Sequence, residues 1–425
     1  MTETRIQSVR GMQDVFPDEA RRWAAAEAAA RAVGVLYGYG EIRTPLVEAT
    51  SLFVRGIGEG TDIVDKEMFS FTDAGGKGLT LRPEGTAGVV RAYLEHHVYK
   101  TVPLARYFYL GPMFRRERPQ AGRRRQFHQF GVEALGSDEA ALDVEIVDLL
   151  MFFLGAAGVR APRLEINSVG CADCRPIYRE KLQAFLRDRS ADLCADCRAR
   201  AERNPLRVMD CKNPCCRPVL EAAPVVSDHL CPGCRDHFQA VLSGLENLGI
   251  AAVRRPSLVR GLDYYTRTVF EVYSDSLGAQ DAVAAGGRYD DLVRDLGGPP
   301  TPAAGFSVGL ERLLLCAGDV TIQPPRSGKK SVYCVCIGEE AAAWGARTVS
   351  GLRRAGIPAL MDYGNRSTRA QFREANRAGV DFVVTRGEAE AGRGKVKFKD
   401  MGEGVEREVA DSLDVLAETI KKGEG

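Results

Sequence analysis

Apolar and polar residues recur with two different periods along this chain, and the arrangement changes near residue 320. Before that point, apolar positions at helical spacing predict helices over residues 16–35, 89–97, 140–155 and 309–316. Runs with β-like composition predict strands over residues 106–117, 126–135, 269–273 and 306–308. Because these helices and strands do not alternate regularly, we expect an α+β core with an antiparallel sheet.

Strands and helices alternate regularly after residue 330. The pattern predicts strands at 331–337, 357–361 and 381–385, separated by helices at 339–355 and 367–378. Such alternation is typical of a small α/β domain with a largely parallel sheet. Pro and Gly residues interrupt the pattern between residues 320 and 330. We therefore expect a core domain over residues 1–325 and a second domain over residues 330–425.

The strands at 106–117 and 126–135 predict a hairpin with a basic loop. A period of two places five residues on one face of the second strand: Arg125, Phe127, Gln129, Gly131 and Glu133. The opposite face is mostly apolar and suits a core. The first face offers a ring for stacking, cations for phosphate and polar groups for a small zwitterion. A solvated basic face is the alternative, but the ring of Phe127 among polar residues weakens it.

Charge and hydropathy say more about where the protein is located in the cell than about which partners it binds. Lys and Arg number 58 against 57 Asp and Glu, so the net charge neither requires nor excludes nucleic acid. Nine basic residues against four acidic ones over 366–399 form a plausible phosphate-contacting surface, or else a solvated charged face. We find no uninterrupted run of 18 apolar residues and no apolar secretory segment in residues 1–13. We expect a cytoplasmic protein with no membrane contact.

Nine of the 12 cysteines are concentrated in the segment 171–234. Disulfides are not expected in a reducing compartment, whereas repeated Cys-x2-Cys pairs are typical of zinc sites. The spacing supports two structural Zn²⁺ sites, formed by Cys171, Cys174, Cys194, Cys197, Cys211, Cys215, Cys231 and Cys234. Reduced, partly buried thiols are an equally weighted alternative.

Two strings in the hairpin resemble one enzyme family. GPMFRRERPQ at 111–120 and RQFHQ at 125–129 resemble motif 2 of the class II aminoacyl-tRNA synthetases, and in particular of the histidine-specific members. The resemblance implies that Arg115 binds the α-phosphate of ATP and that Glu117 holds the adenine amino group. It also implies that Phe127 stacks against adenine.

Further strings extend the resemblance over nearly the whole chain. They are TLRPEGT at 80–86, LVRGLDYYTRTVFE at 258–271, AGGRYD at 285–290 and AAGFSVGLERL at 303–313. The resemblance implies that histidine is bound by Glu84, Gly85, Thr86, Gln129, Glu133, Arg260, Tyr264 and Tyr265. It makes Arg115 and Arg260 the catalytic arginines and places Arg312 on the terminal phosphates. Taken singly, these strings also fit a capped turn, a packed strand and a surface arginine.

The implied histidine pocket makes chemical sense. A neutral imidazole has one donor and one acceptor nitrogen, and a carboxylate with a phenol can contact both. A pocket with such buried polar groups rejects side chains that leave them unpaired, by ~10⁴–10⁵-fold.

The resemblance carries expectations for the whole protein. It implies a class II core with an α/β anticodon-binding domain, and ATP-dependent ligation of L-histidine to tRNA(His) through a histidyl-adenylate. Mg²⁺ would accompany ATP, the chain would form a homodimer, and the insertion at 171–234 would stabilise itself or approach the tRNA acceptor arm. The alternative is a non-catalytic regulatory subunit of histidine biosynthesis. That relative usually lacks the anticodon-binding domain and has degraded signature strings, whereas both are present here.

Overall fold

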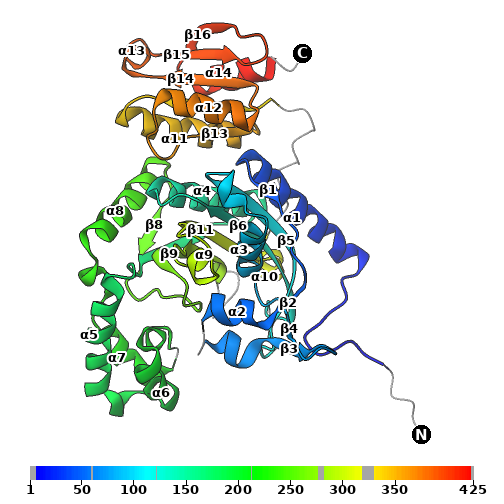
Figure 1. The fold of residues 1–425 in the computed structure, drawn as a ribbon, viewed down its shortest axis with the longest axis vertical. Coiled ribbons are helices and arrows are strands. Elements are labelled where there is room, and N and C mark those ends of the chain that lie inside the picture. The colour runs from blue at the N-terminus through cyan, green and yellow to red at the C-terminus, as the bar shows by residue number, and fades with distance from the viewer. Residues whose placement is uncertain are drawn as a thin grey trace.

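The computed structural model describes residues 6–422 except 59–60, 121, 212, 276–281 and 318–329. Figure 1 shows a central core, a small helical lobe at lower left and a C-terminal domain at the top. The expected domain boundary at 320–330 falls almost entirely outside the described residues.

The core is built on one eight-stranded sheet, in the order β1-β5-β6-β11-β10-β9-β7-β8. Its strands are β1 (Gly40–Glu41), β5 (Ala105–Phe114), β6 (Gln126–Leu135), β7 (Arg163–Ser168), β8 (Ala252–Arg254), β9 (Thr266–Tyr273), β10 (Ala282–Arg288) and β11 (Ala303–Gly309). The β1/β5 and β7/β8 pairs are parallel and the other pairs in this sheet are antiparallel. The expected α+β core with an antiparallel sheet is therefore confirmed.

Long helices cover one face of this sheet. They are α1 (Pro17–Leu36), α4 (Ala140–Ala156), α8 (Pro232–Asn247) and the shorter α10 (Leu310–Cys316). The apolar side chains of α4 bury against β6, where the rings of Phe130 and Phe153 meet edge to face at 4.8 Å. Burial of this kind stabilises the core by about 25 cal/mol per Å² of apolar surface. The helices predicted at 16–35, 140–155 and 309–316 match within two residues.

Shorter elements close the other side of the core. They are α2 (Thr50–Ile57), α3 (Thr86–Glu95), α9 (Leu292–Asp295) and a three-stranded sheet of β2 (Val47–Ala49), β4 (Gly78–Leu81) and β3 (Phe69–Thr72). Helix α3 begins three residues earlier than the predicted helix at 89–97, because the carboxylate of Glu84 accepts from the backbone N–H groups of Thr86 and Ala87 and caps the helix there.

The Cys-rich insertion forms the helical lobe of Figure 1. It contains α5 (Cys174–Asp188), α6 (Ala195–Arg203), α7 (Arg217–Glu221) and several short 3₁₀ turns. A separate core of buried residues, including Tyr178, Leu182 and Leu186, lies inside it. The insertion is thus a small module with its own interior.

The C-terminal domain has a five-stranded sheet in the order β13-β12-β14-β15-β16. Its strands are β12 (Val332–Cys336), β13 (Ala359–Met361), β14 (Phe382–Arg386), β15 (Lys395–Asp400) and β16 (Glu406–Ala410), and its helices are α11 (Glu339–Arg354), α12 (Thr368–Ala378), α13 (Glu388–Ala391) and α14 (Leu413–Lys422). The three predicted strands are parallel neighbours, but β15 and β16 are antiparallel additions. The expected largely parallel sheet is therefore a mixed one, because the alternating Lys-Val-Lys-Phe-Lys run folds as a strand.

Helix α11 docks the C-terminal domain against α4 through two ion pairs, of which the pair of Arg353 and Glu145 is buried and the other has an exposed arginine. Arg353 pairs with Glu145 at 2.7 Å, and Arg354 pairs with Asp148 at 2.7 Å. The hydroxyl of Tyr37 also donates to Asp148, at 2.6 Å. Ion pairs therefore hold the two domains together, and not apolar packing alone.

Candidate active site

The polar face of the hairpin lines a cavity of about 280 Å³. Phe127, Gln129 and Glu133 border it, while Phe130 and Val132 on the opposite face belong to the core. The period-two interpretation of this strand is confirmed. Its partner β5 ends at Phe114 rather than at residue 117. The backbone N–H of Arg116 turns away from β6 and donates to the backbone carbonyl of Glu67 at 2.6 Å.

A buried carboxylate forms the deep end of this cavity. Glu133 accepts a hydrogen bond from the hydroxyl of Thr86 at 2.6 Å and a second one from the hydroxyl of Tyr289. Burial raises the pKa of Glu133 to about 8, although both hydrogen bonds act to lower it. The ring of Tyr264 packs edge to face on Tyr289 at 5.6 Å. This end is an enclosed polar chamber with aromatic walls.

Two glycines give the chamber its space. A β-carbon on Gly131 would overlap the ring of Tyr109, and one on Gly305 would overlap the carboxylate of Glu133. Both positions therefore require glycine, because a neighbouring side chain lies too close to the backbone for a β-carbon to fit.

Helix α3 starts beside the chamber, and a carboxylate satisfies its first backbone donors. Glu84 accepts from the N–H of Thr86 at 2.6 Å and from the N–H of Ala87 at 2.9 Å. Thr86 is therefore not the capping side chain, and its hydroxyl is directed to Glu133 instead. Burial raises the pKa of Glu84, while the two backbone hydrogen bonds act to lower it.

Three arginines from distant parts of the chain border the same cavity: Arg115, Arg260 and Arg312. Arg115 donates to the carbonyl of Pro83 at 2.8 Å, and its guanidinium lies 5.3 Å from the Phe127 ring centroid. Arg260 pairs with Glu271 and lies 5.6 Å from the centroid of Tyr265.

Arg312 reaches the same cavity from the opposite wall, where its guanidinium donates to the carbonyl of Ala282 at 2.6 Å. Burial, followed by the nearby charge of Arg123, lowers the pKa of Arg312. Arg115 and Arg123 have Glu117 as a partner, whereas Arg312 makes no ion pair within the described residues, so its charge is available to a multiply charged anion.

Several buried polar atoms around the cavity have no hydrogen-bond partner within the described residues. They are the hydroxyl of Tyr109, Oε1 of Gln129 and Nε of Arg260. Buried polar groups are nearly always paired in folded proteins, so unpaired ones around a cavity are typical of a site for a polar ligand.

Sequence reasoning missed four residues that line this cavity: Tyr109, Arg123, Glu271 and Tyr289. Tyr289 lies in the string at 285–290, and Arg123 in the basic loop, but neither was singled out. Tyr109 pairs directly across from Gly131 in the β5/β6 ladder, so the register of the hairpin would have revealed it.

The cysteines of the insertion form two groups of four. Cys171, Cys174, Cys231 and Cys234 form one, and Cys194, Cys197, Cys211 and Cys216 form the other. The prediction that Cys215 is a ligand is wrong. Its side chain is exposed, whereas that of Cys216 is buried and belongs to the second group of four cysteines.

Comparison with known proteins identifies the family. A family model described as histidyl-tRNA synthetase matches residues 11–313, and a model described as anticodon binding domain matches residues 331–422. The chain belongs to the histidyl-tRNA synthetase family. The expected class II core and anticodon-binding domain are therefore confirmed.

Individual members of the histidyl-tRNA synthetase family are similar over nearly their full length. The histidine–tRNA ligase of Anaeromyxobacter dehalogenans is 51% identical over 397 residues, covering 93% of this chain and 95% of that protein. The histidine–tRNA ligase of Moorella thermoacetica is 49% identical over 400 residues, covering 94% and 95%. The crystal structure of apo Staphylococcus aureus histidyl-tRNA synthetase matches with a TM-score of 0.61 at 33% identity, covering 98% of this chain and 100% of that one. Among the described helices, none combines the length and apolar character needed to cross a bilayer.

Proposed function

We propose that this chain ligates L-histidine to tRNA(His) in two steps, through a histidyl-adenylate. The observation that carries the proposal is the convergence of Arg115, Arg260 and Arg312 on one cavity beside the enclosed carboxylate of Glu133. A triphosphate next to an imidazole-sized chamber is the ligand pair that this arrangement favours.

The chamber suits histidine in particular. An oxygen of the Glu133 carboxyl group would accept from one imidazole nitrogen, and a tyrosine hydroxyl, from Tyr264 or Tyr109, would donate to the other. Glu84 and Gln129 would take the α-ammonium group, with Gly85 and Thr86 forming the backbone wall beside it. Tyr265 would close the pocket from the side of Arg260.

ATP would lie along the arginines. Phe127 would stack on adenine once Arg115 moves from its ring to the α-phosphate, and Glu117 would accept from the adenine amino group. Arg312 would bind the terminal phosphates. Arg260 would orient the histidine carboxylate for in-line attack, and Arg115 would stabilise charge on the α-phosphate as pyrophosphate leaves.

The cavity also suits Mg²⁺, because the carboxylate of Glu271 borders it and carboxylate oxygens with phosphates are the ligands this ion prefers. The ion would neutralise charge on the leaving pyrophosphate.

The remaining parts of the proposal concern assembly. The C-terminal domain would bind the anticodon arm of tRNA(His), and the chain would work as a homodimer in the cytoplasm. Each group of four cysteines would hold one structural Zn²⁺.

ATP–pyrophosphate exchange measured with each of the twenty amino acids tests the proposal. We expect exchange with histidine alone, followed by histidine transfer to tRNA(His). Exchange with another amino acid, or none with any, would overturn it. Silence combined with histidine binding would favour the regulatory subunit instead, against which the intact 258–271 string and the anticodon domain already argue.

A further inference from the structure

We propose that the Cys-rich insertion is a two-zinc module that holds the histidine-binding loop, residues 258–265, in its binding conformation. The inference rests on the proposed function for the meaning of that loop. It deepens that function by assigning the insertion a positioning role. The two parts of the argument are the geometry of the cysteines and the contacts between module and loop.

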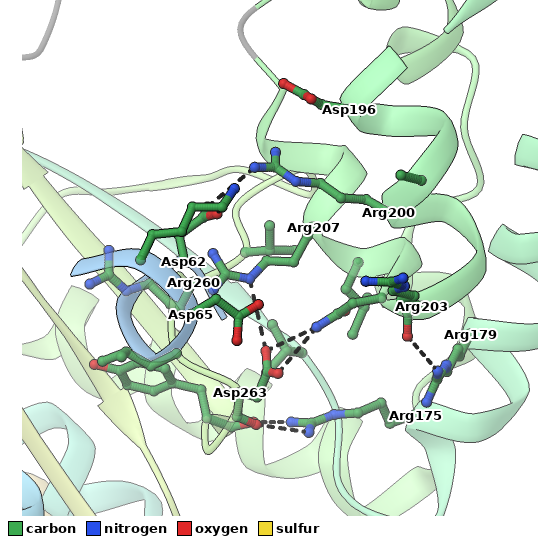
Figure 2. A pocket seen from close by; sticks show the side chains of 18 residues that line it. Asp62, Asp65, Arg175, Arg179, Asp196, Arg200, Arg203, Arg207, Arg260 and Asp263 are labelled. Carbon is green, nitrogen blue, oxygen red and sulfur yellow. Dashed lines mark hydrogen bonds and ion pairs between the residues drawn. The ribbon is translucent and has the colours of Figure 1, made fainter. Parts of the chain in front are cut away.

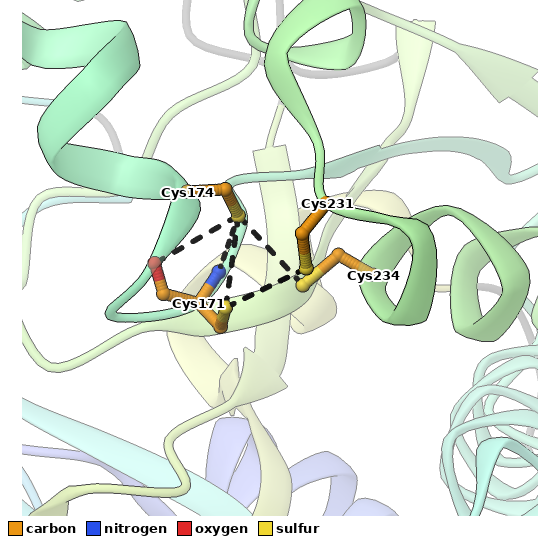
Figure 3. A group of neighbouring side chains, drawn as sticks. All are labelled: Cys171, Cys174, Cys231 and Cys234. Carbon is orange, nitrogen blue, oxygen red and sulfur yellow. Dashed lines mark hydrogen bonds between the residues drawn. The ribbon is translucent and has the colours of Figure 1, made fainter.

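The first group of cysteines has tetrahedral spacing. Figure 3 shows Cys171 and Cys174, at the start of α5, facing Cys231 and Cys234, at the start of α8. Sulfur–sulfur distances are 3.7 Å for Cys171 to Cys174, 3.9 Å for Cys171 to Cys231 and 3.8 Å for Cys174 to Cys234. A zinc–sulfur bond of about 2.3 Å gives a tetrahedral edge of about 3.8 Å. The four sulfurs are far beyond disulfide distance and surround one ion-sized point.

The second group repeats this arrangement with Cys194, Cys197, Cys211 and Cys216, whose sulfurs all lie within 4.8 Å of one another. Backbone N–H groups also point at these sulfurs. The N–H of Cys194 donates to the sulfur of Cys216 at 3.2 Å, and the N–H of Cys197 to that of Cys194 at 3.4 Å. Such donors favour thiolates, which are the form that binds a metal.

The composition of the module's core indicates that a bound metal would add to its stability. Its interior is small, and four of its buried members are the cysteines Cys174, Cys197, Cys216 and Cys234. Small modules rarely obtain enough stability from apolar burial alone and commonly use structural metals. All-thiolate tetrahedral sites select zinc or iron, and closed sites fed by Cys-x2-Cys pairs are typical of structural zinc.

Three side chains of the module reach the histidine-binding loop. Arg175, next to the ligand Cys174, donates to the carbonyl of Tyr265. Asn204 donates to both carboxylate oxygens of Asp263, at 3.2 Å each. Arg207 donates to the carbonyl of Gly261. Figure 2 shows Arg175 and Arg207 directed toward Asp263 and its neighbours. All three side chains of the module line a cavity of about 520 Å³.

The loop that they hold carries the residues proposed to bind histidine. Arg260 lies between the two cavities and borders both, and Tyr264 and Tyr265 follow Asp263 directly. The core also holds this loop: the N–H of Asp263 donates to the carbonyl of Ile57 at 3.2 Å, and Arg260 pairs with Glu271. The contacts from the module are therefore additional to those of the core. If the module loses its metal, Arg175 and Arg207 lose their fixed positions, and the segment from Gly261 to Tyr265 is held less firmly.

Metal content tests the first part. Protein purified without chelator should contain about two zinc atoms per chain by plasma mass spectrometry. Cys211→Ser should reduce this to about one, whereas Cys215→Ser should leave it at two, because Cys215 lies outside both groups. Fewer than one zinc per wild-type chain, or iron in place of zinc, would overturn the proposal.

Histidine affinity tests the second part. Arg207→Ala should keep two zinc atoms and raise the KM for histidine about tenfold, with a smaller change in kcat, as expected for the loss of one charged hydrogen bond. Arg207→Lys should recover part of the loss. Arg187→Ala is the matched control, since Arg187 is an exposed arginine of the same module whose one ion pair among the described residues is with Glu202. An unchanged KM for histidine in Arg207→Ala would overturn the positioning role.

Failure of the proposed function looks different from failure of this inference. A wild-type chain with two zinc atoms but no histidine-dependent exchange would contradict the proposed function and leave the metal sites standing. Normal exchange from a zinc-free chain would contradict only the inference.

Discussion

Thr86 donates a 2.6 Å hydrogen bond to Glu133, so that helix α3 and strand β6 meet at one buried carboxylate. Burial raises the pKa of Glu133 from an ordinary value of 4.5 to about 8. Between these two values the folded chain keeps a proton that the unfolded chain releases. The contribution of Glu133 to stability is therefore full below pH 4.5 and is lost as the pH rises toward 8.

Glu133→Gln should remove this pH dependence. From pH 5.5 to 8, wild-type stability should fall relative to the variant by up to about 1.4 kcal/mol per pH unit, because one proton is linked to folding. Urea unfolding of both proteins at the two pH values measures it. Glu139→Gln, at an exposed glutamate, should follow the wild type. Parallel curves for wild type and Glu133→Gln would contradict the assignment.

Tyr109→Phe should impair histidine binding with little effect on stability. The Tyr109 hydroxyl makes no well-formed hydrogen bond within the described residues, and its neighbours Thr86 and Glu133 already bond to each other, so we expect its loss to cost the free protein little. In the proposed complex it contacts the ligand, and we expect the KM for histidine to rise about tenfold. Histidine titration in the exchange assay, with Tyr107→Phe as control, checks this. A large fall in the unfolding midpoint without a change in KM would argue for a structural hydroxyl.

Arg312→Lys should reduce ATP use although the charge is kept. A lysine cannot reproduce the fork that donates to the carbonyl of Ala282 and still reach phosphate oxygens. We expect kcat/KM for ATP to fall by about 10²-fold, while histidine binding measured without ATP stays within twofold. Arg294→Lys, at an exposed position on α9, should behave as the wild type. Equal losses for both substrates would contradict a specific phosphate role.

Arg353→Met should loosen the C-terminal domain. Arg353 and Glu145 are buried and 2.7 Å apart, and without Arg353 the remaining ion-pair partner of Glu145 within the described residues is Arg106, at 3.5 Å. We expect a loss of about 1.5–3 kcal/mol in the free energy of unfolding, as for one hydrogen bond to a charged group. Arg347→Met, at an exposed arginine of the same helix, should cost less than about 1 kcal/mol. The double variant with Glu145→Gln should lose less than the sum of the two single variants; simple additivity would mean that the pair is not coupled.

Arg369→Ala and Arg373→Ala should weaken tRNA binding. Both arginines are exposed on α12, and neither has an ion pair within the described residues, unlike Arg377 on the same helix. Each substitution should reduce the slope of log affinity against log salt by about one. Filter binding of tRNA(His) over a potassium chloride series measures the slope. Arg393→Ala, where Glu408 pairs at 2.8 Å, serves as control, and an equal slope change there would point to a general charge effect.

The sequence predicted the structure best where the alternation of apolar and polar side chains also separates residues with different chemistry. On β6, alternation alone separated the site residues Phe127 and Glu133 from the core residues Phe130 and Val132. The family strings then predicted roles for the arginines, which no local pattern could supply. Their meeting at one cavity brings together residues that are 52 to 197 positions apart in the sequence.

Other features depended on information that local pattern does not contain. Tyr109 faces the site because of its register opposite Gly131, and register is set by the partner strand. Cys215 and Cys216 are adjacent, so spacing could not decide which one turns inward. Strand β15 was not predicted. Its lysines alternate with Val396 and Phe398, and the run was interpreted as a charged surface rather than as a strand with one apolar face.

Gly131 and Gly305 have a consequence for how this protein can vary. At Gly131 a single added methyl group would overlap the ring of Tyr109, and at Gly305 it would overlap the carboxylate of Glu133. Alanine, elsewhere a mild replacement, would therefore displace one of the two side chains that shape the chamber. The positions of Tyr109 and Glu133 thus depend on two absent side chains as much as on their own polar contacts.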